Sequence, residues 1–121
     1  MSTQLRDVSV RLGDADILRD VSVDENARTI AVIGENGSGK STFARLIGGL
    51  VSRTAGEMRI LGLDPATHAK ELQRRTAIVF SNPDAQILMP TVAEDVAFSL
   101  RPERLPAEER RARVSAALER F

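Results

Sequence analysis

The chain has 121 residues, 42% of them hydrophobic, and its 17 basic and 17 acidic residues cancel. This length supports one domain with a core, and the balanced charge lacks the positive field typical of nucleic-acid-binding proteins. No apolar run approaches the roughly 20 residues of a membrane-spanning helix, the first residues do not resemble a signal peptide, and the lack of cysteine excludes a disulfide scaffold. We expect a cytoplasmic protein that binds no nucleic acid and has no membrane-spanning segment of its own.

Apolar and polar residues alternate over residues 4–12 and again over 17–24, and the turn-favouring sequence Gly-Asp-Ala-Asp separates the two runs. Alternation with a period of two predicts half-buried strands, and the turn between them predicts an antiparallel pair. The apolar positions of the first run are Leu5, Val8, Val10 and Leu12.

Residues 34–41 read GENGSGKS, which is a complete G-x-x-x-x-G-K-S phosphate-binding loop. An apolar, β-branched run at 28–33 precedes it and predicts a buried strand, and apolar residues at helical spacing follow it as far as residue 50. Strand, loop and helix form the context that this motif requires.

The residue types of this loop suit a nucleoside triphosphate. The glycines let backbone N–H groups approach phosphate oxygens, and a helix beginning near Gly39 directs its N-terminus at the same phosphates. Lys40 adds a full positive charge at the β and γ phosphates, Ser41 offers a hydroxyl to Mg²⁺, and Thr42 adds a donor near the α phosphate. The expected binding residues are Gly34, Glu35, Asn36, Gly37, Ser38, Gly39, Lys40, Ser41 and Thr42.

Further elements follow from turn signals and periodicity. We expect a short strand over residues 58–61, a short helix over 69–74, and a second buried strand over 76–80 in a sheet with helices on its faces. The Asn82–Pro83 step favours a turn. Two more helices are expected: one begins with a capping box of Thr91 and Glu94, and one begins at Pro106 and carries an apolar stripe of Val114, Leu118 and Phe121.

This organisation resembles the N-terminal half of an ATP-binding cassette (ABC) ATPase. The resemblance rests on the phosphate loop, the T-x-G-x-x-x-x-x-G pattern of residues 54–62, and an apolar run that leads into the region of the family's Q-loop. The strings NPDAQ and TVAEDVAF that follow are similar to the ATPase subunits of energy-coupling factor importers. The resemblance implies an α/β fold of the P-loop NTPase type: residues 1–27 as an antiparallel β segment, 28–80 as the P-loop core, and 81–121 as the Q-loop and the start of a helical subdomain.

The resemblance also implies a function. An ATPase of this kind binds ATP with Mg²⁺ and couples ATP hydrolysis to uptake of a vitamin or a metal ion. It lies at the inner face of the cell membrane through its partners, which are a second ABC ATPase subunit and a transmembrane subunit that would dock near residues 91–100. The solute is left open.

The chain departs from the family pattern at three points. Ser81 stands where the Q-loop glutamine is expected, with Gln86 as the nearest substitute, and Leu12 stands where an aromatic residue usually stacks on adenine. The L-S-G-G-Q signature and the catalytic glutamate do not occur up to Phe121. We therefore expect a sequence truncated before the signature motif, with no catalytic residue of its own and no turnover.

Other functions stay open. A stand-alone nucleotide-binding module without turnover fits the residues, and so does an ABC protein that does not act in transport. A small P-loop kinase or GTPase is disfavoured because Asn82-Pro83-Asp84 is not the N-K-x-D guanine-binding motif and no arginine-rich lid is evident.

Overall fold

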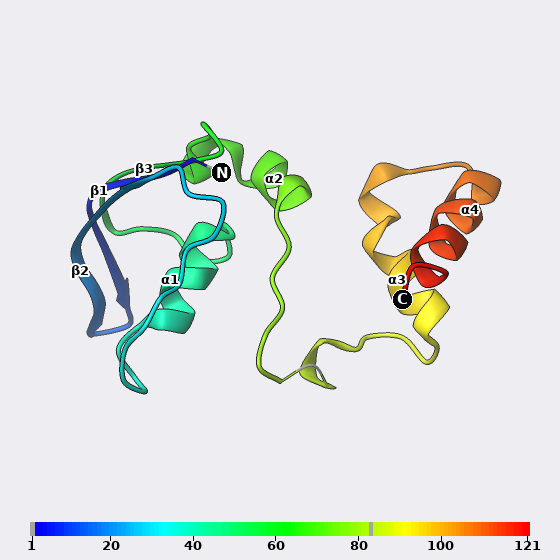
Figure 1. The fold of residues 1–121 in the computed structure, drawn as a ribbon, viewed down its shortest axis with the longest axis horizontal. Helices are drawn as coiled ribbons and strands as arrows, with labels where there is room; N and C mark the ends of the chain where they lie inside the picture. The colour runs from blue at the N-terminus through cyan, green and yellow to red at the C-terminus, as the bar shows by residue number, and fades with distance from the viewer. Residues whose placement is uncertain (1, 83) are drawn as a thin grey trace. The chain divides into compact units, whose positions relative to one another are not determined.

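In the computed structural model, which describes residues 2–82 and 84–121, three antiparallel strands form one sheet (Figure 1). β1 (Thr3–Leu12) lies between β2 (Ala15–Glu25) and β3 (Ala55–Ile60) and pairs with both. The antiparallel pair expected from the alternating pattern is confirmed. The turn between its strands is shorter than expected, because β2 already begins two residues after Gly13.

β1 and β2 contain the same six residues, Leu-Arg-Asp-Val-Ser-Val, at positions 5–10 and 18–23. The two copies pair antiparallel about Val8 and Val21, which face each other. The leucine of each copy faces the last valine of the other. The hairpin therefore has an internal twofold symmetry that follows from the repeated sequence.

Each copy of the repeat contains a β-bulge at its aspartate. Asp7 and Asp20 have positive φ angles of 50° and 47°, and the strand register shifts beside them. Such an extra residue turns the following side chains to the opposite face. The bulge therefore brings the leucine and both valines of each copy to one face of the hairpin, although the leucine and the first valine are three positions apart. That Leu-x-x-Val-x-Val spacing is the sequence signal for the bulge.

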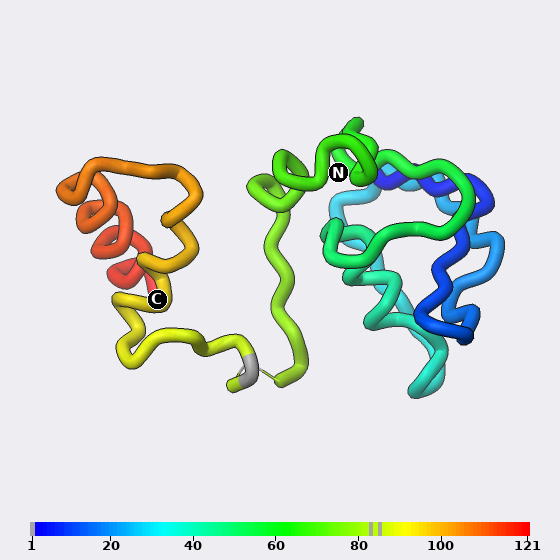
Figure 2. The backbone as a smooth tube through the Cα atoms, turned by 180° about the vertical axis from the view of Figure 1, so that it is seen from behind, coloured from blue at the N-terminus to red at the C-terminus, as the bar shows by residue number. Residues whose placement is uncertain are grey.

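Two helices pack with the sheet in the first unit of the chain, Met1–Ile78 (Figures 1 and 2). α1 (Lys40–Ile47) follows the phosphate-binding loop and contacts β2, and α2 (Pro65–Arg75) contacts β3. Strands and helices together bury one core of apolar side chains, made of Leu5, Val8, Val10, Leu18, Leu46, Met58, Ile60 and Leu72.

α2 and β3 are both longer than the sequence predicts. α2 begins at residue 65 because Asp64 caps it: Asp64 Oδ1 accepts the Ala66 N–H at 2.9 Å, and the proline that follows Asp64 suits the first turn. β3 begins at residue 55, in the expected turn, because Thr54 binds β1. Both the N–H and the hydroxyl of Thr54 donate to Ser9 O, at 2.8 and 3.1 Å.

Residues 28–33 and 76–80, expected as buried strands, form no strand within the described part of the chain. A buried strand needs neighbouring strands to pair with its N–H and C=O groups. Among the described residues, neither segment has such a neighbour. Several of their apolar side chains are exposed instead, and Ile33 and Val79 are 94% and 91% exposed.

The second unit, Val79–Phe121, contains α3 (Val92–Ser99) and α4 (Ala107–Leu118), which contact each other. The capping box expected at the start of α3 is confirmed, and α4 follows Pro106 as expected. The turn expected at the Asn82–Pro83 step rests on Pro83, which lies outside the described residues, as does the side chain of Ala85.

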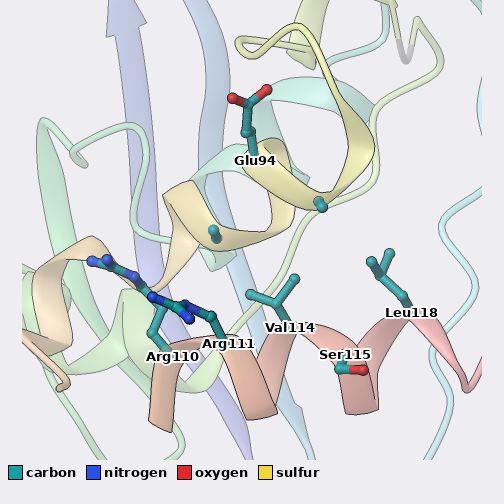
Figure 3. Close-up of a pocket in the computed structure, with 8 residues that line it drawn as sticks. Glu94, Arg110, Arg111, Val114, Ser115 and Leu118 are labelled. Atoms are coloured by element: carbon teal, nitrogen blue, oxygen red, sulfur yellow. The ribbon is translucent and has the colours of Figure 1, made fainter. Parts of the chain in front are cut away.

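A groove of about 350 Å³ runs between α3 and α4 (Figure 3). Val114 and Leu118 point into it from α4, while Glu94 points away from α4. The expected apolar stripe is correct at Val114, which is buried. It fails further along, because Leu118 is partly exposed and Phe121 lies beyond the helix and is fully exposed.

Candidate nucleotide-binding site

The phosphate-binding loop joins residues 28–33 to α1 (Figure 2). Its residues 34–38 are exposed. The Ser38 N–H donates to Glu35 O at 3.2 Å and closes a turn. Gly37, inside this turn, has a φ angle of 83°, a left-handed conformation that glycine adopts without steric cost. The loop thus has a glycine at a turn position with a left-handed backbone, although the motif itself requires glycine only at positions 34 and 39.

The N-terminus of α1 has unpaired backbone donors. Its first helical hydrogen bond joins the Phe43 N–H to Gly39 O at 2.8 Å. The N–H groups of Lys40, Ser41 and Thr42 come before that bond and have no acceptor inside the helix. In the described residues no side chain caps this end, and the first turn has no acidic residue. Together with the helix dipole, these donors favour an anion.

The Lys40 side chain crosses the loop. Its Nζ donates to Gly34 O at 2.8 Å and to Glu35 O at 2.6 Å. An ammonium group has three N–H donors, and the hydrogen bonds to these carbonyls use two of them. A phosphate oxygen can take the third, so Lys40 is able to bind a ligand while it holds the loop closed.

Ser41 is exposed in the first turn of α1, where its hydroxyl can reach a ligand. Hydroxyl oxygen is a hard donor, as Mg²⁺ prefers, and Mg²⁺ commonly takes one or two protein oxygens and fills its shell with phosphate oxygens and water. Among the described residues, no group of three or more His, Cys, Asp or Glu could hold a metal. The Ser41 hydroxyl is thus the kind of single protein oxygen that Mg²⁺ takes when phosphates supply the others.

β2 supports the point where the loop becomes α1. Gly39 has a φ angle of 94°, and a Cβ there would lie 2.9 Å from Leu18 Cδ2 and 3.2 Å from Ile17 O. Such contacts are too close for most side chains, so the absence of a Cβ lets the backbone of the helix start rest directly on β2. Nothing in the sequence motif predicts this contact, because its two sides are about 20 residues apart.

The other residues expected at the site lie apart from the loop in sequence. Leu12 ends β1 and is 44% exposed. Ser81 and Gln86 lie in the second unit, both exposed, and Gln86 ends a 3₁₀ turn, Asp84–Gln86. Leu12 and the phosphate-binding loop both belong to the first unit.

The adjacent carboxylates Glu94 and Asp95 bind backbone groups near the start of α3. Glu94 Oε2 accepts the Thr91 N–H at 3.2 Å as part of the capping box. Asp95 Oδ1 accepts the N–H groups of Leu88 and Met89 at 2.9 and 3.1 Å. Asp95 therefore fixes the segment that leads into α3, a role that the sequence pattern does not reveal.

The ABC transporter family profile matches residues 18–121 of this chain. The chain belongs to the ABC transporter family. A solved structure of cbiO1 from Clostridium perfringens, described as part of the ABC transporter complex cbiONQ, has a TM-score of 0.76 and 26% identity, and the match covers 98% of this chain and 49% of that one. The α/β fold of ABC ATPase type expected from the sequence is thus confirmed.

Two relatives of this ABC chain have names that describe transport ATP-binding proteins. It is 38% identical over 121 residues to the biotin transport ATP-binding protein BioM of Rhizobium etli, covering 100% of this chain and 54% of that protein. It is 41% identical over 105 residues to the energy-coupling factor transporter ATP-binding protein EcfA1 of Enterococcus faecalis, covering 85% of this chain and 38% of that protein. The resemblance to energy-coupling factor ATPases is confirmed.

The chain spans about half the length, or less, of the curated relatives it matches. Within the described residues, none of the helices has the length and apolar character that crossing a membrane requires.

Proposed function

We propose that this chain binds ATP with Mg²⁺ through residues 34–42 and belongs to the ATP-binding subunit of an energy-coupling factor type importer. The observation that carries the proposal is the arrangement of Lys40, whose ammonium lies across the phosphate-binding loop at the start of α1. A fixed cation, unpaired N–H groups and a helix N-terminus in one place favour a polyphosphate. The names of BioM and EcfA1 support the importer assignment.

The residues at the end of the loop have separate roles in this proposal. The N–H groups of Gly39 to Thr42 bind phosphate oxygens, and the third N–H of Lys40 binds between the β and γ phosphates. The Ser41 hydroxyl binds Mg²⁺, which neutralises phosphate charge when it is bound. These residues bind and orient the triphosphate, and none of them activates the water that hydrolysis consumes.

For the whole protein, we propose a role in transport. ATP hydrolysis drives uptake of a solute such as a vitamin, and the ATPase acts from the cytoplasmic face as a partner of a second ATPase subunit and a transmembrane subunit. Exposed Ser81 and Gln86, with the region of residues 91–100, would face the transmembrane partner. The catalytic carboxylate and the signature motif belong to a part of the ATPase outside these 121 residues.

Titration with ATP and Mg²⁺ tests the binding site. Lys40→Ala removes the one lysine of the loop, and Lys70→Ala, on the exposed face of α2, is a matched control because it deletes the only other lysine. A charge-assisted hydrogen bond is worth about 1.5–3 kcal/mol, so we expect ATP affinity to fall about 10- to 100-fold in Lys40→Ala only. Equal affinities in both variants and the original chain would overturn the assignment of the site.

An ATPase assay tests whether this chain binds ATP without hydrolysing it. The purified chain should bind ATP and show no ATPase activity above background. Turnover that depends on Lys40 would mean that the catalytic carboxylate lies within residues 1–121 instead.

A further inference from the structure

The Leu18 side chain occupies the space beside Gly39, at the start of α1. Its side chain is 8% exposed and belongs to the core, and its Cδ2 lies 2.9 Å from the position that a Cβ on Gly39 would occupy. Gly39 is also the residue whose C=O accepts the first hydrogen bond of α1. A core side chain of β2 thus lies directly against the residue from which the helix and its unpaired N–H groups extend.

We propose that Leu18 is a positioning residue of the phosphate-binding site, which rests on the proposed function of the loop. Gly39 has no side chain to absorb a change in packing, so any shift at Leu18 moves the backbone itself. The N–H groups of Lys40 to Thr42 move with it, because they belong to the same rigid first turn. Binding groups must be held within about 0.5 Å of their working geometry by locked packing around them. Leu18 is the core side chain that supplies this support from β2.

The repeated sequence provides a matched control for Leu18. Leu5 holds the same place in the first copy of Leu-Arg-Asp-Val-Ser-Val and is buried to a similar extent, at 5% exposed. It pairs with Val23 and Met58, near the opposite end of the hairpin from Leu18. Leu5 and Val10, the partner of Leu18, are five positions apart along β1, which corresponds to roughly 16 Å of strand. The same substitution therefore removes equal volume from the core at either leucine. Only the substitution at Leu18 also removes a side chain that lies beside Gly39.

Titration of the full chain with ATP and Mg²⁺ tests the proposal, at a temperature where urea unfolding shows every variant to be folded. Both Leu18→Ala and Leu5→Ala should lower stability, since each leaves a cavity. We expect ATP affinity to fall about tenfold in Leu18→Ala and to stay within about twofold in Leu5→Ala. Leu18→Met, which keeps the volume of the side chain, should restore affinity. If ATP affinity falls equally in the two alanine variants, Leu18 stabilises the core and does not position the loop.

The amide NMR signals of the nucleotide-free protein provide a readout that does not depend on ATP. Signals of residues 39–42 should shift in Leu18→Ala and stay in place in Leu5→Ala. If those signals stay in place in both variants, the proposal is wrong whatever the affinities. If the original chain shows no Lys40-dependent ATP binding, the proposed function fails, and the NMR comparison still decides whether Leu18 positions the loop. If Leu18→Ala does not fold, the smaller change Leu18→Val is compared with Leu5→Val.

Discussion

Asp7 and Ser22 bind each other twice across the hairpin: the Asp7 N–H donates to Ser22 Oγ at 2.9 Å, and the Ser22 hydroxyl donates to Asp7 Oδ1 at 3.1 Å. Asp20 and Ser9 repeat the arrangement at 3.0 and 3.3 Å. A bulge takes a backbone N–H out of the strand ladder. The serine of the opposite repeat satisfies that N–H in both cases, which explains how the hairpin tolerates two bulges.

Removing one of these serines should weaken the hairpin. Ser22→Ala leaves the Asp7 N–H without its partner, and we expect the free energy of unfolding to fall by about 1 kcal/mol. Ser52→Ala, at an exposed serine outside the strands, is the control and should change it by less than about 0.5 kcal/mol. Urea unfolding followed by circular dichroism measures both. If the two variants are equally stable, the serine hydroxyl does not stabilise the bulge.

Gly56 permits the close approach of β3 to the bulge of β1. Its φ angle is 82°, and a Cβ there would clash with the backbone oxygen of Asp7. We expect Gly56→Ala to lower the free energy of unfolding by about 3 kcal/mol or more, since a backbone atom cannot move aside as a flexible side chain can.

Gly62 is a control that separates the cost of a positive φ angle from the cost of the clash with Asp7. Its φ angle is 78°, but a Cβ there would meet nothing within 4 Å. Gly62→Ala should therefore suffer only from the strained φ angle, at about 1 kcal/mol. Similar losses in the two variants would mean that the clash with Asp7 does not matter.

The Arg53–Asp64 ion pair makes stability depend on pH. Arg53 Nη1 and Nη2 donate to the two carboxylate oxygens at 2.8 and 3.1 Å. These hydrogen bonds, followed by the one from the Ala66 N–H, lower the pKa of Asp64. A carboxylate whose pKa is lower in the folded state stabilises the fold above its unfolded pKa of about 3.9. That stability is lost as the pH falls through the lowered pKa.

Asp64→Asn isolates this charge, because asparagine can still cap α2. At neutral pH the variant should be less stable by about 1 kcal/mol, and the gap should close as the pH falls well below about 4. Asp16→Asn, which breaks a more exposed pair with Arg11, is the control and should cost less. Thermal unfolding between acid and neutral pH measures the difference. A gap that persists in acid would show that the charge of Asp64 is not its cause.

The residue at position 12 should affect the affinity for ATP if it lies at the adenine base. An aromatic ring can stack on adenine and contributes about 0.5–1.5 kcal/mol beyond its buried area, whereas leucine cannot stack. We expect Leu12→Tyr to raise ATP affinity about 2- to 10-fold and Leu12→Ala to leave it nearly unchanged. Since this side chain is partly exposed, neither change should unfold the protein. If Leu12→Tyr leaves ATP affinity unchanged, Leu12 does not lie at the adenine.

Local patterns in the sequence predicted local structure well. The capping box of Thr91 and Glu94 involves residues three apart, so the sequence alone specifies it. The phosphate-binding loop likewise depends on eight consecutive residues, and the α1 helix follows it as expected.

Features that depend on distant partners could not be predicted in this way. An apolar run such as residues 28–33 becomes a strand only where another strand pairs with it, and the run itself carries no information about that partner. The contact of Leu18 with Gly39 and the hydrogen bonds of Lys40 depend in the same way on how the backbone folds. For these, the residue types indicated the chemistry but not the geometry.

The hydrogen bonds of Lys40 to Gly34 and Glu35 have a further consequence for affinity. Ordering a flexible loop when a ligand binds costs conformational entropy that subtracts from the binding free energy. In the proposed site, the ammonium that would bind the phosphates already ties the loop together. Much of that entropy would therefore be lost during folding, before a triphosphate binds.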